Sequence, residues 1–126
     1  MKIWCGYGSE HSANLVIIGE FETAEKAQAA ADVLSEATNI MVAEEEAGNI
    51  KGGDVPTKYP DPLLKLTMSK NVLFSLSDIE QLLYEYGQNV MGNQLIIRTD
   101  EYGINVFLSV MLQHGAKIQV YSAHNE

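Results

Sequence analysis

The chain has 126 residues, and its 17 acidic and 8 basic side chains give a formal net charge of −9 at pH 7. This length is typical of one domain that folds without disulfides or metal. The few scattered basic residues argue against a nucleic-acid partner, and no apolar run approaches the roughly 20 residues that cross a membrane.

The first predicted elements are two strands. Residues 2–8 contain Trp4 and Tyr7, as a short strand would, and a polar loop with one glycine follows. Residues 14–21 are apolar at the consecutive positions Leu15 to Ile18. Because a strand that is apolar on both sides is usually central in its sheet, we expect residues 13–21 to lie between residues 94–99 and 117–122.

A long helix is predicted after Thr23, whose hydroxyl can cap the first free amides. Its apolar positions recur every three or four residues, and the helix is expected to end before Gly48. The face predicted to be buried consists of Ala27, Ala30, Ala31, Leu34, Ala37 and Met41.

The middle of the chain is predicted to be a loop followed by two short helices. Residues 50–62 contain all three prolines and two glycines. Asp61 is expected to cap a helix that begins at Pro62 and ends near Met68. Residues 77–80 have the pattern of a capping box, which predicts a helix with Ile79, Leu82 and Leu83 on its apolar side.

The last third predicts a hairpin, a helix and a strand. Residues 85–91 and 94–99 flank the turn residues Gly92 and Asn93. A helix that ends at Gly115 follows, and then residues 117–121 alternate between polar and apolar side chains. The predicted apolar face of this helix consists of Ile104, Phe107, Leu108, Met111 and Leu112.

This order of elements predicts a single α+β domain over residues 1–126. Without the first strand and the helical insert it is β-α-β-β-α-β, the order of a ferredoxin-like sandwich. Both main helices should then cover one face of the sheet. The insert, residues 50–84, or a second subunit in a homodimer could cover the other face.

The sequence also predicts one candidate site. Because the first and last core strands are expected to be antiparallel neighbours, the loop before one should meet the residues after the other. The side chains brought together at this sheet edge are Tyr7, Glu10, His11, Ser12, Tyr121, Ser122 and His124.

Two imidazoles beside a carboxylate could bind a transition metal or transfer protons, and Ser12 beside His11 could be an activated nucleophile. However, surface loops are commonly rich in such residues, and the chain has neither an H-E-x-x-H motif nor a pair of cysteines. A structural role is therefore favoured, and neither a catalytic residue, a metal nor a cofactor is assigned.

Two segments resemble a known family. Residues 2–12 have the sequence KIWCGYGSEHS and are followed by Asn14-Leu15-Val16, and residues 115–124 have the sequence GAKIQVYSAH. These segments resemble the opening and the ending of a small bacterial protein family of unknown function. The resemblance covers nearly the whole chain and implies a free-standing, single-domain bacterial or phage protein, but no activity.

Two functions remain open. The acidic charge and small size favour a non-catalytic binding or regulatory module, similar in action to inhibitor or immunity proteins that cover a basic protein partner. The alternative is a small enzyme, or a domain that binds a metal or small ligand, at the edge of His11 and His124. The one cysteine, Cys5, and the absence of a signal peptide predict a cytoplasmic protein without membrane contact.

Overall fold

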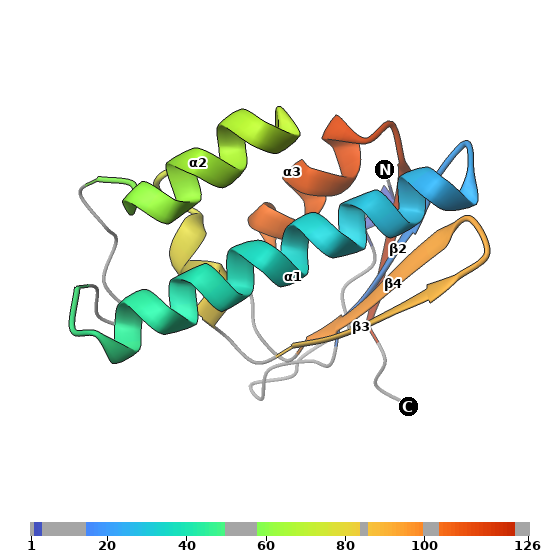
Figure 1. Ribbon diagram of the computed structural model, residues 1–126. Helices are drawn as coiled ribbons and strands as arrows, with labels where there is room; N and C mark the ends of the chain where they lie inside the picture. Colours follow the sequence, from blue (N-terminus) through green and yellow to red (C-terminus); the bar gives the residue numbers. More distant parts are fainter. Residues whose placement is uncertain (1, 4–14, 50–57, 84–85, 100–103, 123–126) are drawn as a thin grey trace.

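A computed structural model describes residues 2–3, 15–49, 58–83, 86–99 and 104–122 (Figure 1). It is a mixed α+β structure in which five strands form one sheet of order β1-β5-β2-β4-β3. The strands are β1 (Lys2–Ile3), β2 (Leu15–Glu20), β3 (Tyr86–Met91), β4 (Gln94–Thr99) and β5 (Lys117–Ser122). The helices are α1 (Ala24–Glu46), α2 (Asp61–Lys70), α3 (Asn105–Gln113) and the short 3₁₀ helix η1 (Ile79–Leu83).

The central position predicted for the first apolar strand is confirmed over β2. This strand pairs antiparallel with β4 on one side and with β5 on the other. Ile17 is fully buried beneath the helices, whereas Val16 and Ile18 are half-buried. The consecutive apolar residues therefore reflect the contribution of β2 to both faces of the sheet.

Local hydrogen bonds define both ends of α1. The Thr23 hydroxyl accepts a hydrogen bond from the Lys26 amide at 3.1 Å, as predicted. At the other end Gly48 has a φ of +82°, which a residue with a side chain rarely adopts. Its amide donates to the Glu45 carbonyl and the next amide donates to Glu44, which is a Schellman ending. The predicted buried face is confirmed, and Val33 joins it.

The described part of the insert lies on the helical side of the sheet and not on the other face, which the insert or a second subunit was expected to cover. α2 packs against α1, and η1 packs against both α1 and α3 (Figure 1). Helix length explains this placement. The 23 residues of α1 span about 34 Å, whereas a six-residue strand spans about 20 Å, so α1 projects beyond the sheet. Leu63, Ile79 and Leu82 bury its projecting half.

The two short helices differ from their predictions in detail. Pro60 occupies the cap position of α2, so Asp61 is its first residue and not its cap. The capping-box pattern at residues 77–80 precedes only five residues of 3₁₀ helix, because the chain enters β3 at Tyr86 and has no room for another α-helical turn.

α3 is rotated relative to its predicted face. Phe107 and Met111 are buried as predicted, but Val106 and Val110 are also buried and Leu112 is 54% exposed. Every side chain of α3 from Val106 to Leu112 is apolar except one serine, so periodicity could not determine which side faces the core. Contacts with α1, β5 and η1 determine the orientation.

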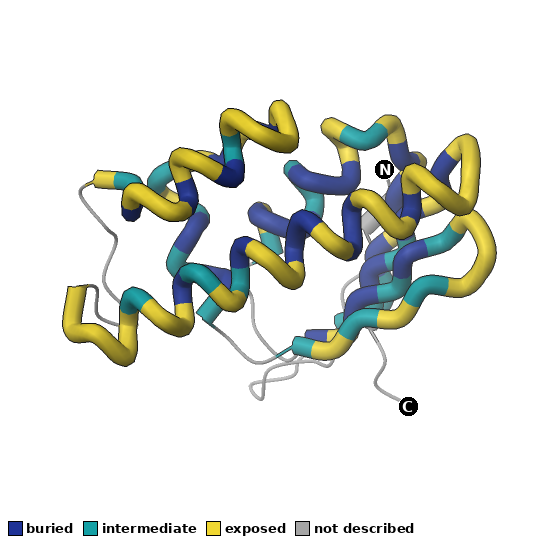
Figure 2. Tube along the Cα trace, viewed as in Figure 1, coloured by how far each residue is buried: buried dark blue, intermediate teal, exposed yellow. Residues whose placement is uncertain are grey.

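The predicted hairpin and final strand are confirmed. Gly92 has a φ of +61° in the turn between β3 and β4. Asn93 connects this turn to the end of β2, because its side chain donates to the Phe21 carbonyl and its own carbonyl accepts from the Phe21 amide, both at 2.8 Å. In β5, Ile118 and Val120 are buried. Figure 2 shows the buried residues gathered between the sheet and the helices. No helix within the described ranges is long and apolar enough to span a membrane.

Candidate functional site

The strand arrangement on which the predicted site depends is present. The first residue of β2, Leu15, lies opposite the last residue of β5, Ser122, and Val16 lies opposite Tyr121. Tyr121 is half-buried, and its hydroxyl donates to the Gln119 side chain beside it. The start of one strand is thus beside the end of the other.

Most of the candidate side chains cannot be placed at this edge. Only Tyr121 and the backbone of Ser122 belong to the described part of the chain. The candidates outside the described residues are Tyr7, Glu10, His11, Ser12 and His124. Their assembly into one site therefore remains a prediction.

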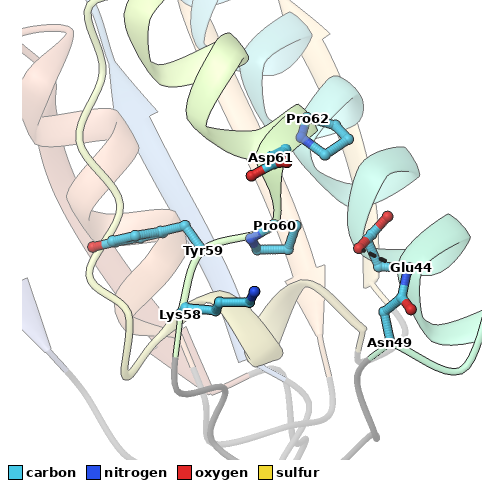
Figure 3. A pocket seen from close by; sticks show the side chains of 7 residues that line it. All are labelled: Glu44, Asn49, Lys58, Tyr59, Pro60, Asp61 and Pro62. Carbon is cyan, nitrogen blue, oxygen red and sulfur yellow. Dashed lines mark hydrogen bonds between the residues drawn. The ribbon is translucent and has the colours of Figure 1, made fainter.

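A polar cavity of about 430 Å³ lies between the end of α1 and the start of α2 (Figure 3). Its lining residues are Glu44, Asn49, Lys58, Tyr59, Pro60, Asp61 and Pro62.

The polar groups of this cavity are largely engaged with neighbours. The Glu44 carboxylate accepts a hydrogen bond from the Asn49 amide at 3.2 Å. The Tyr59 hydroxyl points away from the cavity and donates to the Phe74 carbonyl at 2.6 Å (Figure 3). No cluster of three or more potential metal ligands occurs within the described ranges. The lining offers one ammonium and two carboxylates, without a nucleophile paired to a base.

A second polar cluster lies between α1 and β3. The Tyr86 hydroxyl is 2.5 Å from the Thr38 hydroxyl, and its ring packs on Phe107 with centroids 4.7 Å apart. Burial raises the pKa of Tyr86 above 10.0, and the hydrogen bond with Thr38 lowers it in part. The Gln88 amide donates to the Ala31 carbonyl and to the Ser35 hydroxyl. These contacts fix α1 on the sheet.

The most exposed large apolar side chains of the helical layer lie on α2, on α3 and on the segment after α2. Met68 is 82% exposed in the last turn of α2, Leu73 is 72% exposed just beyond it, and Leu112 is 54% exposed in the last turn of α3. We call these three residues the apolar corner. The ends of α2 and α3 are close together in the view of Figure 1, and hydrogen bonds of Gln113 join the segment after α2 to the end of α3.

The Gln113 side chain connects the segment of Leu73 to the end of α3. Its Oε1 accepts from the Leu73 amide at 2.8 Å, and its Nε2 donates to the Leu73 carbonyl at 2.7 Å. Val72 and Phe74, on either side of Leu73, are buried. Leu73 therefore points outward by strand-like alternation from a backbone that is bonded to the end of α3.

One basic side chain, Lys65, is a helical neighbour of Met68 on α2, three residues before it. Lys65 and Lys70 are exposed on α2, and the Lys70 ammonium lies 3.9 Å from the Glu36 carboxylate of α1. Leu64, 41% exposed one turn before Met68, extends the apolar surface along α2. The sequence pattern does not reveal this surface, because it predicts a buried Leu112 and leaves the orientation of Leu73 within its apolar run open.

Comparison with known proteins gives a family and no activity. No curated protein and no solved structure matches the chain significantly. The model of a family of unknown function, DUF6375, matches residues 1–126, and the chain therefore belongs to this family, in agreement with the resemblance of its two terminal segments.

Proposed function

We propose that this chain is a non-catalytic binding module, a regulator of the inhibitor or immunity type, which acts by occupying a protein partner at the apolar corner. The observation that carries the proposal is the exposure of Leu73 on a backbone held by Gln113. Large apolar side chains that are both exposed and fixed in place are typical of association surfaces.

The surroundings of the corner favour a particular partner chemistry. Burial of each exposed side chain would contribute about 1.5–3 kcal/mol. Lys65, an exposed neighbour of Met68 on α2, favours a carboxylate at the rim of the partner. The best partner is thus an amphipathic protein segment with an apolar face and acidic flanks.

The net charge of −9 also favours a basic partner, which would dock away from the apolar corner. The exposed acidic residues Glu45 and Glu46 at the end of α1 are a surface for such a partner. The two versions of the proposal therefore differ in which substitutions abolish binding.

The proposal also includes the setting of the protein. We infer a bacterial source from the resemblance of the terminal segments to a bacterial family. We also infer a cytoplasmic location without nucleic-acid partners, because the chain has one cysteine and only eight scattered basic residues.

We further propose that the fold is a ferredoxin-like sandwich. The order β2-α1-β3-β4-α3-β5 and the antiparallel sheet order β5-β2-β4-β3 support this assignment. In such a sandwich the insert that carries α2 is an addition, which agrees with a role in binding and not in the basic architecture.

A peptide selection tests the binding proposal even while the partner is unidentified. A displayed library of random 16-residue peptides would be selected on the wild-type chain. We expect enrichment of amphipathic sequences that combine Leu, Phe or Trp with Asp and Glu, and loss of their binding at least tenfold in Leu73→Ser.

Val42→Ser is the matched control. Val42 is also an exposed apolar side chain, 37% exposed on α1, but it does not belong to the apolar corner. Selected peptides should bind this variant like the wild type. Selection of basic peptides that bind Leu73→Ser normally would contradict binding at the apolar corner and would favour the acidic surface of Glu45 and Glu46.

A further inference from the structure

We propose that two copies of this chain associate through β3, each β3 pairing with the other in antiparallel orientation about a two-fold axis. β3 forms one edge of the sheet, and no strand in the described part of the chain pairs with its outer side. It pairs with β4 without interruption over six residues. The outer backbone groups of such a strand are a template for another strand.

The composition of β3 permits this association. Residues 86–91 contain no charged side chain and no proline, and the flanking charges along the chain are Glu85 and Arg98. Proteins usually protect an edge strand with lysine, proline or a bulge, and β3 has none of these. An uncharged edge is notable in a chain with a net charge of −9, since most other surfaces would bring acidic groups together.

The α1 side chains that contact this edge are uncharged. Ser35 of α1 contacts the Gln88 side chain, and Thr38 contacts the Tyr86 hydroxyl. The α1 side-chain groups in contact with β3 are thus hydroxyls and not carboxylates. The charge pattern of both layers thus favours a second copy of this chain as the occupant.

The side chains of β3 favour one register. Gly87, Asn89 and Met91 are exposed, and they share one face because strand side chains alternate. If Asn89 lies opposite Asn89 of the other copy, Met91 lies opposite Gly87. Met91 is 57% exposed, and a Cβ placed on Gly87 would have no atom within 4 Å. The other copy's Met91 therefore has room over Gly87, and the two Asn89 amides can bond to each other.

Mass measurement tests the association. Light scattering after gel filtration at about 100 μM should give twice the chain mass of 13.9 kDa for the wild type. Asn89→Lys opposes two ammonium groups at the two-fold axis, so this variant should be monomeric while its circular dichroism stays unchanged. Its urea midpoint should equal that of the wild type when both are measured at a concentration low enough for the wild type to dissociate. A monomeric wild type, or a dimeric Asn89→Lys, would overturn the proposal.

Cysteine cross-linking tests the register. Opposed residues of antiparallel strands have Cα atoms about 4.5–5.5 Å apart, which suits a disulfide. In a Cys5→Ser background, Asn89→Cys should form a disulfide-linked dimer on mild oxidation. Met91→Cys, on the same exposed strand face, should not. Equal cross-linking of both, or none in Asn89→Cys, would refute this pairing.

Discussion

The Gln113 side chain lies beside Leu73 and satisfies its backbone groups, a role that a neighbouring strand has in a sheet. Its amide bonds to both backbone groups of Leu73 as a neighbouring strand would, and Ser109 accepts a further hydrogen bond from it at 3.0 Å. An amide side chain can do this because it carries one acceptor and two donors. The exposure of Leu73 therefore depends on a residue 40 positions away in the sequence.

This dependence predicts the behaviour of Gln113→Ala. The Leu73 amide should lose its protection from hydrogen exchange, because its acceptor is removed. The free energy of unfolding should fall by no more than about 1.5 kcal/mol, since water can replace exposed hydrogen bonds. Exchange monitored by NMR checks the prediction, and unchanged protection of Leu73 would contradict it.

Tyr86 predicts a pH dependence of stability. Burial raises the pKa of its hydroxyl above 10.0, so the unfolded chain releases this proton first. Between pH 10 and the folded-state pKa the unfolded state binds fewer protons, and stability falls as the pH rises. Below pH 10 this contribution is fully present. Urea unfolding from about pH 9 to 11 should show a steeper loss in the wild type than in Tyr86→Phe; parallel curves would refute the assignment.

Gly19 permits the close approach of α3 to the sheet. A Cβ at this position would lie 2.8 Å from the Met111 Sδ atom and 3.2 Å from Phe21, and Met111 is fully buried. Gly19→Ala should therefore destabilise the chain by about 1–3 kcal/mol. Gly87→Ala, where the added methyl group meets open space within one copy, is the control and should be nearly neutral in the monomeric Asn89→Lys background. Urea unfolding measures both, and similar values for the two would contradict the packing described.

For the helices and strands, the buried face was predictable where the residues of one segment alone determine it. The spacing of alanines identified the buried face of α1, and alternation identified that of β5. The orientation of α3 and the side of the sheet chosen by α2 were not predictable. Both depend on surfaces that distant elements leave open, namely the projecting half of α1 and the contacts around η1.

The rotated face of α3 gives a direct comparison of two apolar positions. Phe107→Ala should destabilise the chain by about 3–5 kcal/mol, because Phe107 is buried and a cavity would remain. Leu112→Ala should change stability by less than about 0.5 kcal/mol, since Leu112 is half exposed. Urea unfolding distinguishes these outcomes. A large effect at Leu112 would mean that the orientation is wrong.

For the molecule as a whole, the acidic charge was evident from the sequence, but the apolar corner was not. Val72, Leu73 and Phe74 are three consecutive apolar residues, and only the fold shows that the middle one faces solvent. The sheet edge at which His11 and His124 were expected to meet was inferred from the topology. The antiparallel pairing of β2 with β5, on which that inference depends, was correctly predicted. The chemistry at that edge stays a prediction, because those side chains lie outside the described residues.

Binding of a protein partner at the apolar corner can be measured by a comparative pull-down. Wild type, Leu73→Ser and Val42→Ser, each with the same affinity tag, would be incubated with lysate of the source cell, and captured proteins would be quantified by mass spectrometry. We expect a protein captured equally by wild type and Val42→Ser, and reduced at least tenfold with Leu73→Ser. Equal capture by all three variants would contradict binding at the apolar corner.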